Sequence, residues 1–173
     1  GTENAFAGIA QAYTDASPVL FLPGHPGREL VGVPPTFDAV RNFSATTKWA
    51  DMIPSARTVS QRMRRAYTLL RSGRPGPVML EIPVDVADES LDGPLDYRPP
   101  RTLRFAADPD SVRDAVSLLL SAEQPLILAG QGVLYGGASD ELTQFAEQLA
   151  APVVTTMLGN SAIHERHPLA VGA

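Results

Sequence analysis

The segment best suited to hold a phosphate is rich in glycine. Gly130, Gly132 and Gly136 follow the apolar run 125–129 and precede a predicted helix. Such a turn lets a phosphate approach the amides of a helix N-terminus. However, the interval between Gly132 and Gly136 is one residue longer than in the dinucleotide-binding fingerprint. The acidic residue expected about 20 residues further on is also missing. The pattern disfavours ordinary NAD binding and leaves open a purely structural turn or another nucleotide contact.

Histidine and cysteine usage argues against a metal or thiol site. The chain has three histidines and no cysteine, which excludes disulfides, thiolate nucleophiles and cysteine metal sites. A zincin helix needs two residues between its Glu and its second His. Here only Arg166 separates Glu165 from His167, and Pro168 follows. We interpret residues 164–167 as surface loop and predict no metal ligands.

Two further features concern charged side chains. Glu81 interrupts an apolar run, where it is either a carboxylate with a perturbed pKa or, as we expect, one at a strand end or in an ion pair. Arginines gather on or near one predicted helix: Arg57, Arg62, Arg64, Arg65, Arg71 and Arg74. Because the net charge is -5, we predict a solvated helix face and no nucleic-acid partner.

Alternating helices and strands must position these residues. Helices are predicted where apolar residues recur at helical spacing, at 2–13, 58–71, 108–120 and 139–150. Short apolar runs predict strands at 19–22, 43–49, 77–82, 125–129 and 152–156. We expect the first strand to be buried on both faces, residues 23–35 to be loop, and residues 130–137 to be a turn.

One predicted helix carries a clear start signal. Asp108 is expected to cap it, with Pro109 at its first position. Its apolar stripe is predicted to be Val112, Ala115, Val116, Leu119 and Leu120.

Length and composition predict a globular α/β protein. The chain has 173 residues, of which 44% are hydrophobic and 19% charged, so it can bury a core and is not a disordered tail. It has no apolar run of about 18 residues, and we expect no membrane span. It also shows no basic, apolar leader, so we expect a cytoplasmic protein.

The strand–helix alternation is interrupted once. Asp88, Glu89, Asp92 and several prolines stiffen the segment between the two alternating parts. We predict two incomplete doubly wound units with parallel sheets, joined by a Pro- and Asp-rich linker. The predicted boundaries are 1–87, 88–106 and 107–173. Each unit has fewer strands than the roughly five or six of a doubly wound domain, so we expect a piece of a larger protein.

Three segments in register resemble the thiamine diphosphate-dependent enzymes of the acetolactate synthase type. The first joins Gly1-Thr2-Glu3-Asn4-Ala5 to Gly8-Ile9-Ala10 and Ala12-Tyr13. The second runs from Ser72-Gly73-Arg74-Pro75-Gly76-Pro77-Val78 to Glu81-Ile82-Pro83-Val84-Asp85-Val86. The third joins residues 125–133 to 151–156 and 167–169. Order and spacing agree along essentially the whole chain, including Thr47-Lys48-Trp49.

The resemblance implies a layout and two cofactors. Residues 1–87 would be the second half of a pyrimidine-binding domain, and residues 107–173 the first part of a central domain. The family's activating glutamate would precede Gly1. The Gly-Asp-Gly segment that anchors the diphosphate and Mg²⁺ does not occur here. We therefore expect thiamine diphosphate and Mg²⁺ in the parent protein, and no catalysis by the chain alone.

The resemblance also implies site residues. Gly24 and His25 stand where a Gly-Gln pair approaches the active site, and Arg28 matches an arginine of the following loop. Phe37 and Asp38 stand at a Phe-Gln pair near the substrate. Six residues match positions that contact FAD in the synthases: Gly130, Gly132, Thr156, Met157, Leu158 and Gly159. Relatives use that domain for FAD, for an ADP moiety or for neither.

The implied activity is decarboxylation of a 2-oxo acid, transfer of its acyl unit to a second carbonyl, or both. Asp38 and His25 replace neutral amides, which favours a neutral acceptor over a second anionic 2-oxo acid. A sibling decarboxylase or aldehyde carboligase is one alternative. Another is a non-catalytic nucleotide-binding module built on residues 130–137. By resemblance we expect a homodimer or homotetramer.

Overall fold

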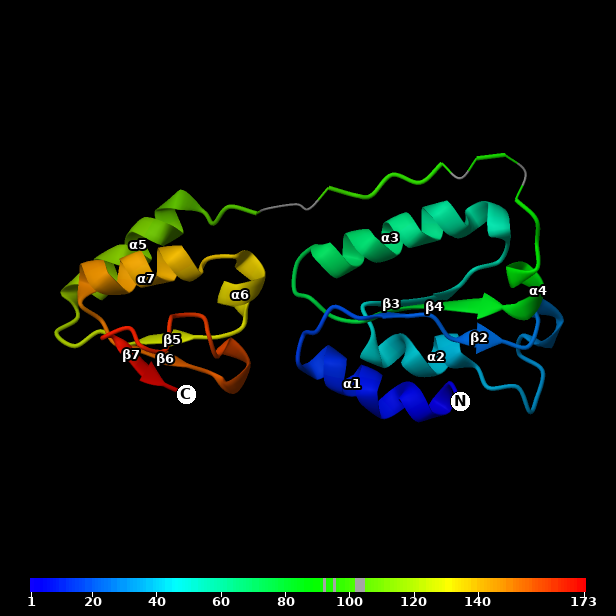
Figure 1. The fold of residues 1–173 in the computed structure, drawn as a ribbon, viewed down its shortest axis with the longest axis horizontal. Coiled ribbons are helices and arrows are strands. Elements are labelled where there is room, and N and C mark those ends of the chain that lie inside the picture. The colour runs from blue at the N-terminus through cyan, green and yellow to red at the C-terminus, as the bar shows by residue number, and fades with distance from the viewer. Residues whose placement is uncertain (92, 95, 102–104) are drawn as a thin grey trace. The chain divides into compact units, whose positions relative to one another are not determined.

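The computed structural model describes residues 1–91, 93–94, 96–101 and 105–173 (Figure 1). It divides into two compact units, Gly1–Phe105 and Ala106–Ala173. Each unit combines helices with a parallel sheet, which confirms the predicted α/β class. Residues 92, 95 and 102–104 of the predicted linker lie outside the described residues. In the part of the chain that is described, no helix is long and apolar enough to cross a membrane.

Strand β4 (Val78–Pro83) is the centre of the first unit's four-stranded sheet. β1 (Leu20–Phe21), β2 (Gly24–His25) and β3 (Trp49–Met52) all pair with it in parallel. Leu20 and Trp49 both pair with Val78, so β1 and β3 lie on opposite sides of β4. Since β4 has neighbours on both sides and helices on both faces, it reads as an almost continuous apolar run.

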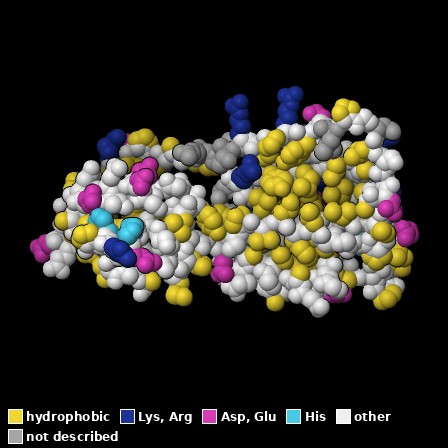
Figure 2. All heavy atoms as spheres, in the orientation of Figure 1, with side chains coloured by type: hydrophobic (Ala, Val, Ile, Leu, Met, Phe, Trp, Pro, Cys, Tyr) yellow, Lys and Arg dark blue, Asp and Glu magenta, His cyan; other side chains and the backbone are white. Residues whose placement is uncertain are grey.

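Helices cover both faces of this sheet (Figure 1). α3 (Val59–Arg71) packs on one face, and α1 (Phe6–Thr14) and α2 (Ala39–Phe43) pack on the other. Side chains alternate along a strand. Val78 and Leu80 therefore join Ala66 of α3 in one core, while Met79 joins Phe43 of α2 in another. Figure 2 shows hydrophobic side chains gathered over α3 and the neighbouring strands.

Short elements complete the first unit. They are η1 (Glu3–Ala5), η2 (Arg28–Leu30), η3 (Ser44–Thr46), η4 (Ala56–Thr58) and α4 (Val84–Ala87).

The strand predicted at 43–49 is wrong over most of its length. Phe43 ends helix α2, residues 44–46 form η3, and the strand begins only at Trp49. The helix forms because Asp38 caps it, its Oδ1 accepting a hydrogen bond of 2.9 Å from the Arg41 backbone amide.

Two neighbouring predictions also need correction. The run 19–22 is strand only at Leu20–Phe21 and is half-buried, because no strand lies beyond β1 among the described residues. Residues 23–35 are not all loop, since they contain β2 and η2. Pro23 separates β1 from β2, and its carbonyl accepts a 2.8 Å hydrogen bond from the Ile82 amide.

The second unit contains a parallel sheet in the order β5 (Ile127–Ala129), β6 (Val153–Thr155) and β7 (Ala170–Gly172). Its helices are α5 (Pro109–Ser121), α6 (Gly132–Gly136), α7 (Ser139–Leu149) and η5 (Met157–Gly159). The turn predicted at 130–137 is therefore mostly helix α6, which ends at Gly137 with a positive φ of 61°.

Helix α5 begins as predicted but does not bury the predicted stripe. The Asp108 carboxylate accepts a 2.8 Å hydrogen bond from the Ser111 amide, and Pro109 follows it. However, no residue of α5 is buried, and Leu120 is 70% exposed. Leu128 of β5 is also 69% exposed. The apolar side chains of α5 that were predicted to pack in a core are therefore exposed to solvent in this unit.

Gly159 packs against the end of β5 so closely that no side chain fits. A Cβ atom there would lie 2.5 Å from the Ala129 carbonyl oxygen and 2.8 Å from the Gly130 backbone. A Cβ at Gly132, by contrast, would meet no atom within 4 Å. Close backbone packing is therefore a sufficient reason for glycine at 159.

We predict that Gly159→Ala destabilises the second unit by about 1–3 kcal/mol, because the contacting atoms are backbone and must shift. Urea unfolding followed by far-UV circular dichroism reports both units, whereas fluorescence of Trp49 reports the first. Only the dichroism should change, and Gly132→Ala is the matched control. A Gly159→Ala chain that unfolds like the parent chain would contradict this packing.

Candidate functional site

A cavity of about 300 Å³ lies in the first unit at the carboxyl ends of its strands. Ligands in parallel α/β sheets bind at this edge. Its lining combines a few apolar groups with titratable ones, chiefly His25, Phe37, Asp38, Asp51, Met52 and Glu81. Three predicted site residues, His25, Phe37 and Asp38, thus meet at one cavity.

The strand register explains why Glu81 joins them. His25 pairs with Pro83 on the neighbouring strand, and Glu81 precedes Pro83 by two residues. Because side chains two apart share a face, His25 and Glu81 point to the same side of the sheet. On the other side of β4, Met52 pairs directly with Glu81.

Glu81 is the most deeply buried acid of the cavity, at 3% exposed. Burial raises the pKa of its carboxyl above the ordinary value of 4.5; His25 opposes this shift, and Asp38 adds to it. Of the alternatives stated from the sequence, the carboxylate with a perturbed pKa fits, and no ion pair of Glu81 occurs among the described residues. Alignment of the carboxyl ends of two predicted strands could have placed Glu81 beside His25.

His25 is held in one orientation by its own loop. The ring is 6% exposed, and its Nδ1 accepts a 3.3 Å hydrogen bond from the Gly27 amide. In a neutral imidazole with Nδ1 as acceptor, Nε2 carries the hydrogen. His25 is therefore suited to donate a hydrogen bond from Nε2.

The two aspartates of the lining have other partners as well. Asp38 is exposed and caps α2. Asp51 forms an ion pair with Arg62 of α3, which the sequence reading placed on a solvated face. Arg65 is exposed as expected, and its guanidinium lies 4.4 Å from the centroid of the Trp49 ring.

Arg28 anchors the loop beside the cavity. Its Nε lies 2.5 Å from Asp85 and its Nη2 lies 2.8 Å from Glu89, while Nη1 donates to the Pro54 carbonyl at 2.9 Å. Glu89, placed in the predicted linker, also accepts a 2.7 Å bond from the Ala56 amide. The described contacts of Arg28 are thus structural, and its role toward a substrate stays a prediction.

Gly24 lies next to His25 in β2. A Cβ atom there would lie 3.9 Å from the Ile82 carbonyl oxygen, which is an ordinary contact. Crowding within this unit therefore does not require glycine at this position.

The predicted cofactor residues of the second unit lie beyond the ends of β5 and β6. The Thr156 amide donates to the Ala129 carbonyl at 3.0 Å, and the Thr156 hydroxyl accepts from the Gly159 amide at 3.0 Å. Met157 is 87% exposed and Leu158 is 52% exposed. The structure brings Gly130, Thr156 and Gly159 together by internal packing, and their contact with a nucleotide stays a prediction.

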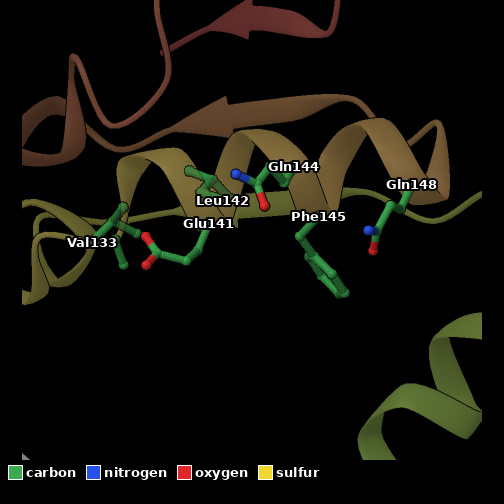
Figure 3. A pocket seen from close by; sticks show the side chains of 7 residues that line it. Val133, Glu141, Leu142, Gln144, Phe145 and Gln148 are labelled. Carbon is green, nitrogen blue, oxygen red and sulfur yellow. The ribbon is translucent and has the colours of Figure 1, made fainter.

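A separate hollow of about 470 Å³ lies along α7 (Figure 3). Val133 lies at one end, and Phe145 and Gln148 point away from the strand behind the helix. None of the six predicted cofactor residues is among those that line this hollow.

Residues 164–167 form a turn in the second unit. His167 Nε2 lies 3.1 Å from a Glu147 oxygen, and its Nδ1 accepts from the Leu169 amide at 3.2 Å. Within the described residues no group of three or more His, Asp or Glu side chains is placed to hold a metal ion.

Comparison with known proteins covers both units. Residues 112–173 match the family model described as "Thiamine pyrophosphate enzyme, central domain". The chain is 36% identical over 99% of its length to the "Probable acetolactate synthase large subunit" of Methanocaldococcus jannaschii, and 32% identical over 95% of its length to the glyoxylate carboligase of Escherichia coli O157:H7. It spans only about 30% of the first relative and 28% of the second.

A solved structure agrees with these sequence relatives. The X-ray structure described as that of a thiamin diphosphate-dependent enzyme from Mycobacterium smegmatis superposes with a TM-score of 0.84 at 31% identity. The match covers 99% of this chain and 34% of that one.

We predict that the Arg28 cluster makes stability fall with acid. Hydrogen bonds from Arg28 lower the pKa of Asp85, and those from the Ala56 amide and Arg28 lower the pKa of Glu89. The unfolded chain then binds more protons, so the contribution is present above about pH 5 and is lost as pH falls toward about 3.

Arg28→Met should therefore lower the urea midpoint of Trp49 fluorescence at neutral pH and flatten its decline in acid. Arg57→Met, which removes an exposed arginine of η4, is the control. Equal acid profiles in the Arg28→Met and parent chains would contradict the cluster's role.

Proposed function

Because the chain belongs, as a partial length, to the acetolactate synthase-like family of thiamine diphosphate-dependent enzymes, we propose that its first unit forms one wall of a 2-oxo acid site. The observation that carries this proposal is the cavity at the carboxyl ends of β2, β3 and β4, where His25, Phe37 and Asp38 meet. The parent protein would release CO₂ from a 2-oxo acid and transfer the remaining acyl unit to an acceptor.

The lining fits the organic part of the cofactor or its substrate, and not a diphosphate. Its charged groups are mainly carboxylates, and the nearby cation Arg62 is already paired with Asp51. Diphosphate and Mg²⁺ would be held by other segments, as the resemblance implies. The chemistry supplied by bound thiamine diphosphate is attack on the 2-oxo carbon and acceptance of the electrons left when CO₂ departs.

The residues of this chain contribute binding and orientation. His25 donates a hydrogen bond from Nε2 to a carbonyl oxygen, while Phe37 and Met52 provide apolar walls that exclude water. Asp38 places a negative charge at the mouth, which disfavours an anionic acceptor. A neutral acceptor, such as an aldehyde or a proton, is therefore preferred over a second 2-oxo acid.

The similarity runs through both units, which favours an enzyme over a stand-alone nucleotide-binding module. For the second unit we retain a nucleotide contact at Gly130, Gly132 and residues 156–159 as a proposal, with FAD and an ADP moiety as the candidates. Assembly as a homodimer or homotetramer in the cytoplasm is likewise proposed from the family.

The direct test compares this chain with the longer protein that carries it. With thiamine diphosphate and Mg²⁺, the longer protein should release CO₂ from pyruvate or glyoxylate, and the 173-residue chain should not. The chain would provide only part of the catalytic machinery. Activity that follows the 173-residue chain through a sizing column, or a longer protein inert toward both acids, would contradict the proposal.

We predict that Asp38→Asn shifts acceptor choice in the longer protein toward a second pyruvate. Asparagine also caps helices, so the change removes charge while keeping the end of α2. Relief of like-charge repulsion of about 1–2 kcal/mol corresponds to a roughly tenfold change in the ratio of acetolactate to aldehyde-derived product. Asp110→Asn, at an exposed position of α5, is the control. An unchanged ratio, or acetolactate as the parent's main product, would contradict the charge argument.

A further inference from the structure

Glu81 is a buried residue whose carboxyl group forms no hydrogen bond with another described residue. It is 3% exposed and lines the cavity rather than the packed core. A buried carboxylate left without partners is costly, so it favours either its protonated form or a ligand in the cavity. The Glu81 carboxyl therefore makes no described contact that would stabilise the fold of the first unit.

The surroundings of Glu81 favour its protonated form, because burial raises the pKa of its carboxyl. Asp38 at the start of α2 raises the pKa of Glu81, and His25 on β2 lowers it, while burial is the largest cause of the upward shift. On β3, Asp51 also lines the cavity, but its carboxylate forms an ion pair with Arg62 of α3. Glu29, on the loop after β2, lies against Gly27. His25 therefore presents the cavity's hydrogen-bond donor, and Glu81 its exchangeable proton.

The proposed reaction class consumes a proton. A 2-oxo acid anion and one proton give an aldehyde and CO₂, and capture of the acyl unit by an aldehyde also takes up one proton. In the second case a new C–C bond forms, the π bond of the acceptor carbonyl breaks, and its electron pair goes to oxygen. A nearby acid must protonate that oxygen.

We propose that Glu81 is this acid, a catalytic residue that delivers its proton to the acceptor's carbonyl oxygen while His25 Nε2–H holds the same oxygen. The inference rests on the proposed function. The O–H bond of the Glu81 carboxyl breaks, an O–H bond of the hydroxyl product forms, and the carboxylate recovers a proton from water before the next turnover.

The activity test uses the longer protein with thiamine diphosphate, Mg²⁺, pyruvate and acetaldehyde. Glu81→Gln should lower the rate of C–C product formation by about 10²–10⁴-fold with little change in KM. It should also remove the loss of activity that the parent shows as pH rises through the titration of Glu81. Glu81→Asp should restore part of the rate, and Glu123→Gln, at an exposed position, is the matched control.

A second readout needs no activity. Carboxyl-carbon NMR of the 173-residue chain should show a pKa of Glu81 above 4.5, lowered by Asp38→Asn. A carboxyl whose folded-state pKa is raised costs stability once pH exceeds its unfolded value. Glu81→Gln should therefore increase the urea midpoint near pH 7 but not near pH 4, whereas a purely structural glutamate would give a decrease at both.

The outcomes separate the two proposals. Absence of CO₂ release by the unsubstituted longer protein would overturn the proposed function and this role with it. Product formation that Glu81→Gln leaves unchanged, or a Glu81 carboxyl that titrates at or below 4.5, would overturn the role of Glu81 alone.

Discussion

Burial of a carboxyl group on the central strand of a parallel sheet is the constraint on which the first unit depends. β4 has neighbours on both sides and helices on both faces, so its side chains are removed from water. Val78, Met79 and Leu80 meet this condition by packing. Glu81, next in the strand, cannot, and its cost is tolerated only where the strand's carboxyl end opens into a cavity. The site thus lies at the carboxyl edge of the sheet, directly beyond the hydrophobic core.

The charged residues around the cavity form ion pairs with one another, whereas those that line it mostly do not. Arg28 joins Asp85 and Glu89 outside the lining, and Arg62 neutralises Asp51 at its rim. These pairs fix the loop after β2 and the position of β3 relative to α3. Among the described residues, no Lys or Arg forms an ion pair with Asp38 or Glu81, which suits a site that must recognise a carbonyl group and supply a proton. A diphosphate has no comparable partner at this cavity.

Helices and strands were predicted correctly where a single local signal, such as apolar periodicity or a capping residue, determines the element. The amphipathic helix α3, the Asp108 cap and the apolar core of β4 follow from periodicity, capping and burial. The strand expected at 43–49 was wrong because the Asp38 cap extends a helix to Phe43. Helical periodicity predicted a buried stripe on α5, yet Leu120 of that stripe is 70% exposed, because burial depends on surfaces that a local pattern does not contain. At the site, the resemblance assigned roles to His25, Phe37 and Asp38, and the apolar run singled out Glu81. Only the strand register places Glu81 beside them.

The central claim is that the cavity at the carboxyl ends of β2, β3 and β4 receives the carbonyl group of the acceptor. The most direct measurement is a crystal structure of the longer protein loaded with thiamine diphosphate, Mg²⁺ and a neutral, non-reactive carbonyl analogue of the acceptor. The account predicts the analogue's carbonyl oxygen within hydrogen-bonding distance of His25 Nε2, with the Glu81 carboxyl facing the same pocket. An analogue bound away from both side chains, with the cavity filled by ordered water, would contradict it.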